Sequence, residues 1–288
     1  RTMALIPFDD RDGWIWFDGE MVPWRDAKVH VLTHGLHYGS AVFEGERMYD
    51  GEIFKLSEHS QRLIDSGRIL DFEVPYSVAE LDQACKDTCA KNGMVDAYIR
   101  PLAWRGSEQM SVSAPDSTIH VMVAAWAWPS MFDPEIKRKG IRMTRARYRR
   151  PDPATAPTAS KAAGLYMICT ISKHVANREG FEDALMLDYR GYVAEATGAN
   201  IFFIRDGVIH TPLADCFLNG ITRQSVIQLA RDKGFEVVER HIKEEELSTF
   251  SECFLTGSAA EVTPVAEIAE FTYTPGNISL SLMDDFSL

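Results

Sequence analysis

The sequence predicts an α+β fold in two domains, because its strand signals cluster in hairpins instead of alternating singly with helices. Asp-Gly pairs lie between apolar runs at Asp18-Gly19 and Asp50-Gly51, the strongest short signal for a hairpin turn. Later hairpins are expected at 190–191 and 206–207. The chain has 288 residues, more than one typical domain of roughly 150 residues. We therefore expect two domains built on mixed or antiparallel sheets.

Helix signals follow the first hairpins. Apolar residues recur at helical spacing between residues 58 and 70. Ser77 and Glu80 have the spacing of a capping box, which predicts a helix that begins there and ends at Gly93. Further helices are expected over about 161–178 and over 222–233, and strands over 97–102, 118–126 and 253–256.

A polar segment divides the chain. Residues 129–140 contain two prolines and several charged side chains, a composition typical of a linker. The sequence thus predicts a smaller N-terminal α/β domain over 1–128 and a larger C-terminal domain over 141–288.

The composition excludes several classes of function. The formal net charge is −12 and no basic run occurs, which argues against nucleic acid or an anionic membrane as a partner. No run of about 18 apolar residues is present, so no transmembrane helix is predicted. The start, 1–3, lacks a signal-peptide pattern, and the five cysteines are sparse. We expect reduced thiols and a cytoplasmic location.

Common motifs of nucleotide, zinc and hydrolase sites are absent: the sequence contains no G-x-G-x-x-G, G-x-x-x-x-G-K-[ST], H-E-x-x-H, C-x-x-C or G-x-S-x-G. His30, His34 and His37 have a spacing that superficially suggests metal binding. Gly35 interrupts them where a strand leads into a loop, so a polar loop is favoured. We predict no metal site.

Two ionisable residues lie among small side chains. Lys161 is surrounded by serine, alanine and glycine, and an amine with little solvent around it can attack a carbonyl to form a Schiff base. A solvated lysine near a helix start is the alternative. Glu195 lies in a run of small and apolar residues, where a carboxylate needs a partner. That partner is either a protonated heterocyclic nitrogen or an arginine from elsewhere in the chain.

Two later segments have features of anion sites. Gly220 lets the backbone approach an anion, and Thr222 is expected as the N-cap of a helix whose first N–H groups can bind phosphate. Ser258 and Ala259 follow a predicted strand and also offer N–H groups and a hydroxyl. An ordinary capped helix and a plain turn are the alternatives.

Arginines interrupt two apolar strands of the N-terminal half. Phe43, Gly45 and Arg47 share one face of their strand, and Tyr98 and Arg100 share one face of theirs. An arginine inside an apolar strand is costly unless it meets an anion. That anion is either a substrate carboxylate or an internal Asp or Glu.

These segments together resemble one family, the fold-type IV pyridoxal phosphate enzymes or class IV aminotransferases, and most of all their branched-chain amino acid aminotransferase members. The likeness covers nearly the whole chain. It implies the two-domain fold of the D-amino acid aminotransferase type, with pyridoxal 5′-phosphate bound by the larger domain, and a homodimer or higher homo-oligomer. Its strongest pieces are 37–45, 98–101, the Lys161 and Glu195 segments, 220–223 and 257–264.

The resemblance also implies a role for each matching residue. Lys161 would be the catalytic lysine that carries the cofactor as a Schiff base, and Glu195 would pair with the pyridine nitrogen. The phosphate and the ring oxygen would be bound by Arg62, Tyr166, Gly220, Ile221, Thr222 and Ser258. The substrate would be bound by Tyr38, Phe43, Gly45, Arg47, Tyr98, Arg100, Ser258 and Ala259. Arg100 is the candidate for the distal carboxylate of glutamate.

The implied reaction is transamination of the branched-chain L-amino acids leucine, isoleucine and valine with 2-oxoglutarate, giving branched 2-oxo acids and L-glutamate in amino-acid biosynthesis. Transamination of D-amino acids or (R)-amines, or an aminodeoxychorismate lyase activity, is the alternative on the same fold, and a binding protein without catalysis is a third reading. Two positions depart from the family pattern: Met131 replaces an expected tyrosine, and Ser258 replaces the more usual threonine.

Overall fold

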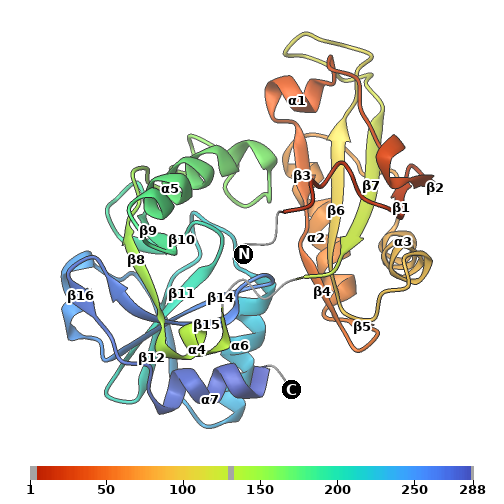
Figure 1. The fold of residues 1–288 in the computed structure, drawn as a ribbon. Coiled ribbons are helices and arrows are strands. Elements are labelled where there is room, and N and C mark those ends of the chain that lie inside the picture. Colours follow the sequence, from red (N-terminus) through yellow and green to blue (C-terminus); the bar gives the residue numbers. More distant parts are fainter. Residues whose placement is uncertain (1–4, 129–132, 287–288) are drawn as a thin grey trace. The chain divides into compact units, whose positions relative to one another are not determined.

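The computed structural model describes residues 5–128 and 133–286, which fall into two compact units (Figure 1). The first unit holds the described residues up to 128 together with Ser160–Gly164, and the second holds the other described residues from 133 onward. The short segment with Lys161 therefore belongs to the first unit. Part of the predicted linker, Pro134–Lys139, forms a helix. Met131 lies outside the described residues.

Seven strands form the antiparallel sheet of the first unit, in the order β2-β1-β7-β6-β4-β5 with β3 beside β6 (Figure 1). Hairpins join β1 to β2 and β4 to β5 at the two Asp-Gly pairs, as the sequence predicts. The strands are β1 (Trp14–Phe17), β2 (Glu20–Pro23), β3 (Ala41–Phe43), β4 (Glu46–Tyr49), β5 (Glu52–Ile53), β6 (Ala97–Arg105) and β7 (Ile119–Trp126). The helices are η1 (Trp24–Asp26), α1 (His34–Tyr38), α2 (Leu56–Ile69) and α3 (Val78–Lys91).

Helices α2 and α3 cover one face of this sheet. Leu63 of α2 and Leu81 of α3 are buried in one apolar core with Ile99 of β6. Burying one such side chain contributes roughly 1.5–3 kcal/mol. The predicted capping box of α3 is confirmed: the Ser77 hydroxyl accepts a hydrogen bond from the Glu80 N–H, and the Glu80 carboxylate accepts one from the Ser77 N–H.

Nine strands form the sheet of the second unit, and this sheet is mixed. Strand β8 runs parallel to β9 and β15, and β12 runs parallel to β13, while the other pairs are antiparallel. The order is β10-β9-β8-β15-β14-β11-β12-β13, with β16 beside β15; a further pairing of β10 with β11 closes six strands into a ring. The strands are β8 (Ile141–Arg145), β9 (Asp183–Leu187), β10 (Val193–Ala196), β11 (Asn200–Arg205), β12 (Val208–Pro212), β13 (Val237–Arg240), β14 (Glu252–Gly257), β15 (Glu261–Ile268) and β16 (Phe271–Thr272).

The remaining helices are α4 (Pro134–Lys139), η2 (Ala163–Tyr166), α5 (Met167–Arg178), α6 (Ile221–Asp232), η3 (Glu244–Thr249) and α7 (Asn277–Phe286). Two apolar cores stabilise the second unit. Neighbouring residues of β11 point to opposite faces of the sheet and pack into different cores. Ile201 belongs to the core made by the ring strands, and Phe202 belongs to the core that packs α6 and α7 against β11 and β14. The predicted α+β class with two domains is confirmed.

Two expectations from composition can be compared with the structure. None of the helices in the described ranges has the length and apolar composition that crossing a membrane requires. All five cysteines are buried and have free thiols, as expected.

Candidate active site

The Lys161 segment is attached to α2 and β3. The Lys161 N–H donates to Ser66 Oγ at 3.0 Å, and the Lys161 carbonyl accepts from the Phe43 N–H at 3.2 Å. Ser160 Oγ donates to the Ser66 carbonyl, also at 3.0 Å. The half-buried Lys161 side chain places Nζ 4.8 Å from the centroid of the Phe43 ring. The backbone of this lysine is thus held on both sides.

These bonds correct the expected start of the following helix. The sequence predicts a helix from about 161, but η2 begins only at Ala163 and α5 at Met167. Lys161 lies before both helices, and its N–H is bound by a serine hydroxyl of another element. Tyr166, the residue expected near the ring oxygen, ends η2 and stands directly before α5.

One face of the first unit's sheet gathers most of the predicted substrate residues. Arg47 lies opposite Tyr98 in the pairing of β4 with β6. Arg100 NH2 donates to the Tyr98 hydroxyl at 2.8 Å, and the Arg100 guanidinium carbon lies 4.5 Å from the Phe43 ring centroid. Arg100 Nε is buried and has no hydrogen-bond partner in the described part of the chain. This face therefore combines aromatic surface with a cation that an anionic group would satisfy.

Position 45 lies against the Tyr98 ring of this face, and no side chain fits there. A Cβ at position 45 would lie 2.3 Å from Tyr98 Oη. The Tyr98 ring is itself fixed, since it packs on Trp126 and Trp128 at centroid distances of 5.0 and 4.7 Å. Tyr38 lies apart from these contacts: its ring is half exposed, packs on His34 and donates to the carbonyl of Met110.

Arg62 of α2 pairs with a buried carboxylate that sequence reasoning did not single out. Arg62 Nε and NH2 donate to the two oxygens of Glu44, each at 2.7 Å. His59 Nδ1 lies 2.6 Å from Glu44 Oε1, and its N–H donates because an ionised carboxylate only accepts. Burial alone would raise the pKa of Glu44, but the Arg62 charge and the bonds from His59 and Arg62 outweigh it and lower that pKa to about 2. Glu44 is thus a fully buried anion.

A second carboxyl group lies beside this one. Glu46 is fully buried, because its partner across β4 and β6 is the core residue Ile99. Neither Glu46 oxygen makes a hydrogen bond of good geometry in the described part of the chain. Burial, followed by the charge of Glu44, raises the pKa of Glu46 well above its ordinary value. Burial and the neighbouring anion thus favour the protonated form of Glu46, whereas Arg62 and His59 favour the ionised form of Glu44.

Glu195 lies on β10 with an arginine that the sequence left unidentified. Arg150 Nε is 3.5 Å from Glu195 Oε1, and both side chains are largely buried. The structure thus contains the arginine partner that the sequence offered as one of two alternatives. Arg150 has four other arginines near it in the sequence, from Arg142 to Arg149, and no local signal distinguishes it from them.

The N-terminus of α6 begins at Ile221, which corrects the expected cap. Gly220 is the N-cap and supplies no side-chain bond, while Thr222 is the second helical residue and is 4% exposed. Gly220 therefore provides no side chain to cap the first N–H groups of α6. Anion sites at helix N-termini use such N–H groups. A Cβ at position 220 would lie 2.3 Å from Asn200 Oδ1, so only glycine allows this close approach.

Asn200, at the start of β11, brings the predicted residues of the second unit together. Its sheet partners are Glu195 on one side and Thr256 on the other. Asn200 Nδ2 also donates to the carbonyl of Leu218, two residues before Gly220. The turn with Ser258 and Ala259 follows directly after β14, which ends at Gly257. The carboxylate, the helix N-terminus and this turn are thus neighbours.

The family model described as "Amino-transferase class IV" matches residues 41–268. The chain belongs to this family. The matched range includes the lysine, the buried Glu195 and both glycine-dependent contacts described above.

Relatives of this class IV aminotransferase are similar over nearly their whole length. A protein of Rickettsia felis named "probable branched-chain-amino-acid aminotransferase" is 45% identical over 266 residues, 92% of this chain and 90% of that protein. The crystal structure of the Escherichia coli branched-chain amino acid aminotransferase superposes with a TM-score of 0.93 at 40% identity and covers 96% of this chain and 94% of that one. The Thermobaculum terrenum enzyme of the same name, in its PLP-form, has a TM-score of 0.86 at 30% identity and covers 96% and 93%.

The residues of this aminotransferase fit a phosphorylated pyridoxal. The α6 N-terminus and its Gly220 approach suit a phosphate, and the buried Thr256 Oγ1 has no hydrogen-bond partner among the described residues. Glu195 is a buried carboxylate that can accept from a ring nitrogen. Lys161 supplies an amine with an aromatic neighbour.

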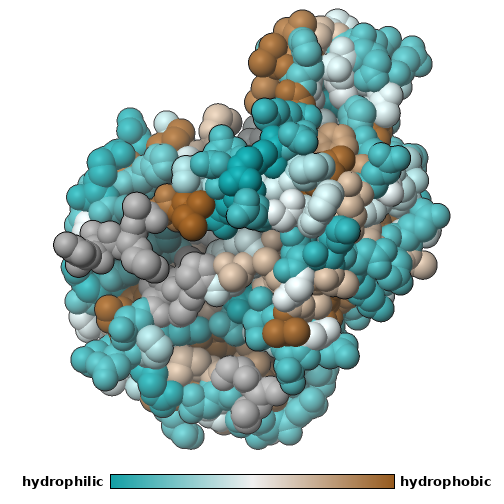
Figure 2. Space-filling view, turned by 45° about the vertical axis from the view of Figure 1, so that its right-hand side comes forward, coloured by the Kyte–Doolittle hydropathy of each residue, from teal (hydrophilic) through white to brown (hydrophobic). Residues whose placement is uncertain are grey.

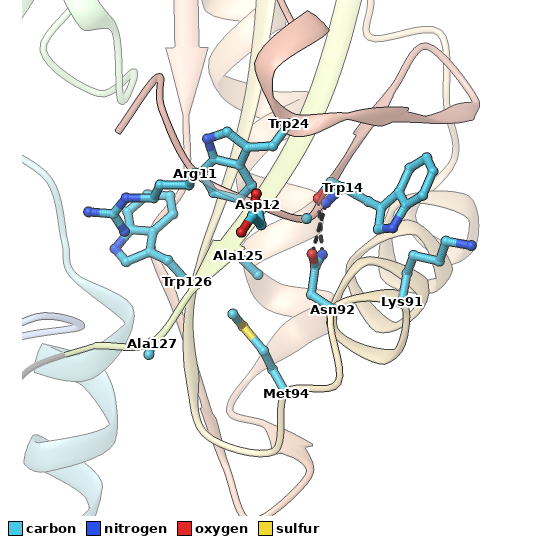
Figure 3. A pocket seen from close by; sticks show the side chains of 11 residues that line it. Arg11, Asp12, Trp14, Trp24, Lys91, Asn92, Met94, Ala125, Trp126 and Ala127 are labelled. Carbon is cyan, nitrogen blue, oxygen red and sulfur yellow. Dashed lines mark hydrogen bonds between the residues drawn. The ribbon is translucent and has the colours of Figure 1, made fainter. Parts of the chain in front are cut away.

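Two other features carry no site. A cavity of about 350 Å³ in the first unit is bordered by Trp14, Lys91, Asn92 and Trp126 (Figure 3). The side-chain amide of Asn92 is already engaged in hydrogen bonds with the backbone, since it accepts from the Trp14 N–H and donates to the Trp14 carbonyl.

The second feature is a cluster of possible metal ligands made by Asp188, Asp215 and Cys216. Arg190 NH2 donates to both carboxylates at 2.7 and 2.8 Å, so an arginine already occupies the position between them.

Proposed function

We propose that this aminotransferase uses pyridoxal 5′-phosphate to transaminate branched-chain L-amino acids with 2-oxoglutarate, giving branched 2-oxo acids and L-glutamate. The observation that carries this proposal is the sheet face on which Phe43 and Tyr98 adjoin the half-buried Arg100. Aromatic surface suits a branched aliphatic side chain, and the arginine suits the second carboxylate of glutamate. The names of the relatives support the same substrate class.

When bound, the cofactor supplies an electron-accepting ring that stabilises negative charge at the substrate α-carbon. Lys161 is proposed to hold the cofactor and then to move the proton at that carbon as base and acid. Glu195, beside Arg150, would accept the ring N–H and keep the nitrogen protonated. Tyr166 would donate to the ring oxygen.

The phosphate is proposed to lie at the N-terminus of α6. Ile221 and Thr222 would donate from the first turn, and Gly220 would leave space for the approach. Arg62 would add a cation, and Ser258 a hydroxyl from the neighbouring turn. The N–H groups of Ser258 and Ala259 would also meet the substrate α-carboxylate.

The substrate side chain is proposed to lie against Phe43 and Tyr98; the space that Gly45 leaves is taken by the Tyr98 hydroxyl, so the glycine sets the position of that ring and does not itself make room for a branched carbon. Burying a four-carbon side chain there would contribute roughly 2–3 kcal/mol. Arg47 borders this face, and its guanidinium lies over Tyr49. Arg100 would bind the distal carboxylate of glutamate when leucine is absent.

A homodimer or higher homo-oligomer is part of the proposal. Figure 2 shows hydrophobic side chains gathered on the first unit where it carries α1. Tyr38, the predicted substrate residue outside the Arg100 group, belongs to the same segment. The exposed apolar residues there are Val29, Val31, Leu32 and Leu36. A surface of this kind suits contact with a second copy.

The assignment of Lys161 can be tested by chemical labelling. Borohydride reduction of the holoenzyme, followed by peptide mapping, should leave the pyridoxyl label on Lys161. A label on Lys55 or Lys173 instead would contradict the assignment. Wild-type protein that takes up no pyridoxal 5′-phosphate would overturn the proposed cofactor altogether.

A further inference from the structure

The buried cluster of Glu44, His59 and Arg62 has a geometry that ordinary packing does not require. Glu44 is 0% exposed, yet it is ionised and bound from two positions of α2. A buried ion pair contributes little to the net free energy of folding, because the cost of desolvation offsets the attraction between the charges. Fixing the orientation of a side chain is a better-supported use of such a pair.

We propose that Glu44 is a positioning residue that holds the Arg62 guanidinium in the orientation in which it meets the cofactor phosphate. This inference rests on the proposed function, in which Arg62 binds that phosphate. It concerns a residue that does not itself touch cofactor or substrate.

The direction of the Arg62 bonds supports this role. Glu44 takes the Nε and NH2 edge of the planar guanidinium with two bonds of equal length, 2.7 Å. A guanidinium has a fixed fork geometry, so fixing one edge also fixes the direction of the NH1 edge. An anion would be met by that second edge.

The same helix face also holds the Lys161 segment. His59, Arg62 and Ser66 are spaced by three and four residues, so they lie on one face of α2. Ser66 Oγ accepts from the Lys161 N–H at 3.0 Å. Helix α2 therefore contacts both Glu44 and the Lys161 backbone. These contacts fix the position of Arg62 relative to Lys161 within the first unit.

Glu46 provides a matched control. It is equally buried and two residues away, but burial raises its pKa and so favours its protonated form, and it makes no well-formed hydrogen bond among the described residues. Glutamine has nearly the shape of the protonated acid, and Glu46→Gln leaves both Arg62 bonds to Glu44 in place. Glu44→Gln has the same change in shape but removes the anion that holds Arg62.

The experiment titrates the apo forms of wild type, Glu44→Gln and Glu46→Gln with pyridoxal 5′-phosphate and, separately, with pyridoxal, which lacks the phosphate. Absorbance reports the dissociation constant of each ligand. We expect Glu44→Gln to bind pyridoxal 5′-phosphate about tenfold more weakly or worse, the range of a lost charge-assisted bond, and to bind pyridoxal like wild type. Glu46→Gln should match wild type with both ligands.

A second arm uses Arg62→Gln. If Glu44 acts through Arg62, adding Glu44→Gln to Arg62→Gln should cause no further loss of pyridoxal 5′-phosphate affinity. If Glu44→Gln fails to fold, Glu44→Asp takes its place, because it keeps the charge but moves the carboxylate away from Arg62 by one methylene. Weaker binding of pyridoxal 5′-phosphate and unchanged binding of pyridoxal are expected for this variant too.

Equal losses for both ligands, or affinities like wild type with both, would overturn the inference and leave Glu44 a structural residue. Loss on top of Arg62→Gln would also overturn it. These outcomes differ from failure of the proposed function, in which wild type itself would not bind pyridoxal 5′-phosphate.

Discussion

Glu44 and Glu46 show how two carboxyl groups in one short stretch acquire pKa values shifted in opposite directions. Glu46 lies opposite the core residue Ile99 and its oxygens have no hydrogen-bond partner among the described residues, while Glu44 meets Arg62 and His59. Both are fully buried, so the difference comes from their partners and not from solvent.

The raised pKa of Glu46 leads to a prediction about how stability depends on pH. Its folded-state pKa is raised above the ordinary 4.5, so above that pH the folded protein keeps a proton that the unfolded chain releases. The contribution of Glu46 to stability is therefore complete below about pH 4.5 and is lost as the pH rises toward the folded pKa, by about 1.4 kcal/mol per pH unit.

Glu46→Gln removes this loss. The free energy of unfolding of both proteins is measured with urea from pH 5 to pH 8. The value for the variant minus the value for wild type should increase as the pH rises. Parallel pH profiles for the two proteins would show that Glu46 is not held neutral by the fold.

Glu195→Gln tests the proposed partner of the cofactor ring nitrogen. The variant should retain the cofactor but lose activity by about 100-fold or more, because an amide beside Arg150 no longer holds the ring nitrogen protonated. Glu245→Gln, an exposed change of the same chemistry, is the control. Turnover of Glu195→Gln close to that of Glu245→Gln would contradict the role.

Single residues also show where sequence reasoning stops. Lys161, Glu195 and Arg100 could be selected because a charged side chain in an apolar or small-residue run stands out locally. Arg150 and Asn200 could not, because their importance arises from strand pairings and from contacts between distant segments.

At the scale of elements, hairpins and helix starts with strong local chemistry were predictable. The Asp-Gly turns and the Ser77 capping box form as expected, because their bonds join residues within a few positions of each other. The predicted helix start at about 161 was wrong: helical structure begins at Ala163, and Lys161 donates its N–H to Ser66, 95 residues away in the sequence, a contact that local sequence does not reveal.

Ser77→Ala tests the contribution of the cap to α3. Loss of a capping hydroxyl should lower the free energy of unfolding by about 0.5–2 kcal/mol, with little change in kcat. Ser107→Ala, at an exposed bend, is a control of the same size. A cap variant as stable as the Ser107 variant would show that tertiary packing alone holds this helix.

At the scale of the whole molecule, assembly is the property that a single chain leaves to experiment. The exposed residues Val31 and Leu36, 69% and 67% exposed, suit burial against a second copy. Light scattering at micromolar concentration should give the mass of a dimer or a larger assembly. A monomer that is still fully active would refute this part of the proposal.

The central claim is that the site prefers branched-chain L-amino acids, and one panel of initial rates tests it most directly. L-Leucine, D-alanine and (R)-1-phenylethylamine are each offered with excess 2-oxoglutarate. We predict the highest rate with L-leucine, because its side chain suits the surface of Phe43 and Tyr98 beside Gly45. A higher rate with D-alanine or with the amine would contradict the branched-chain assignment and leave the family unchanged.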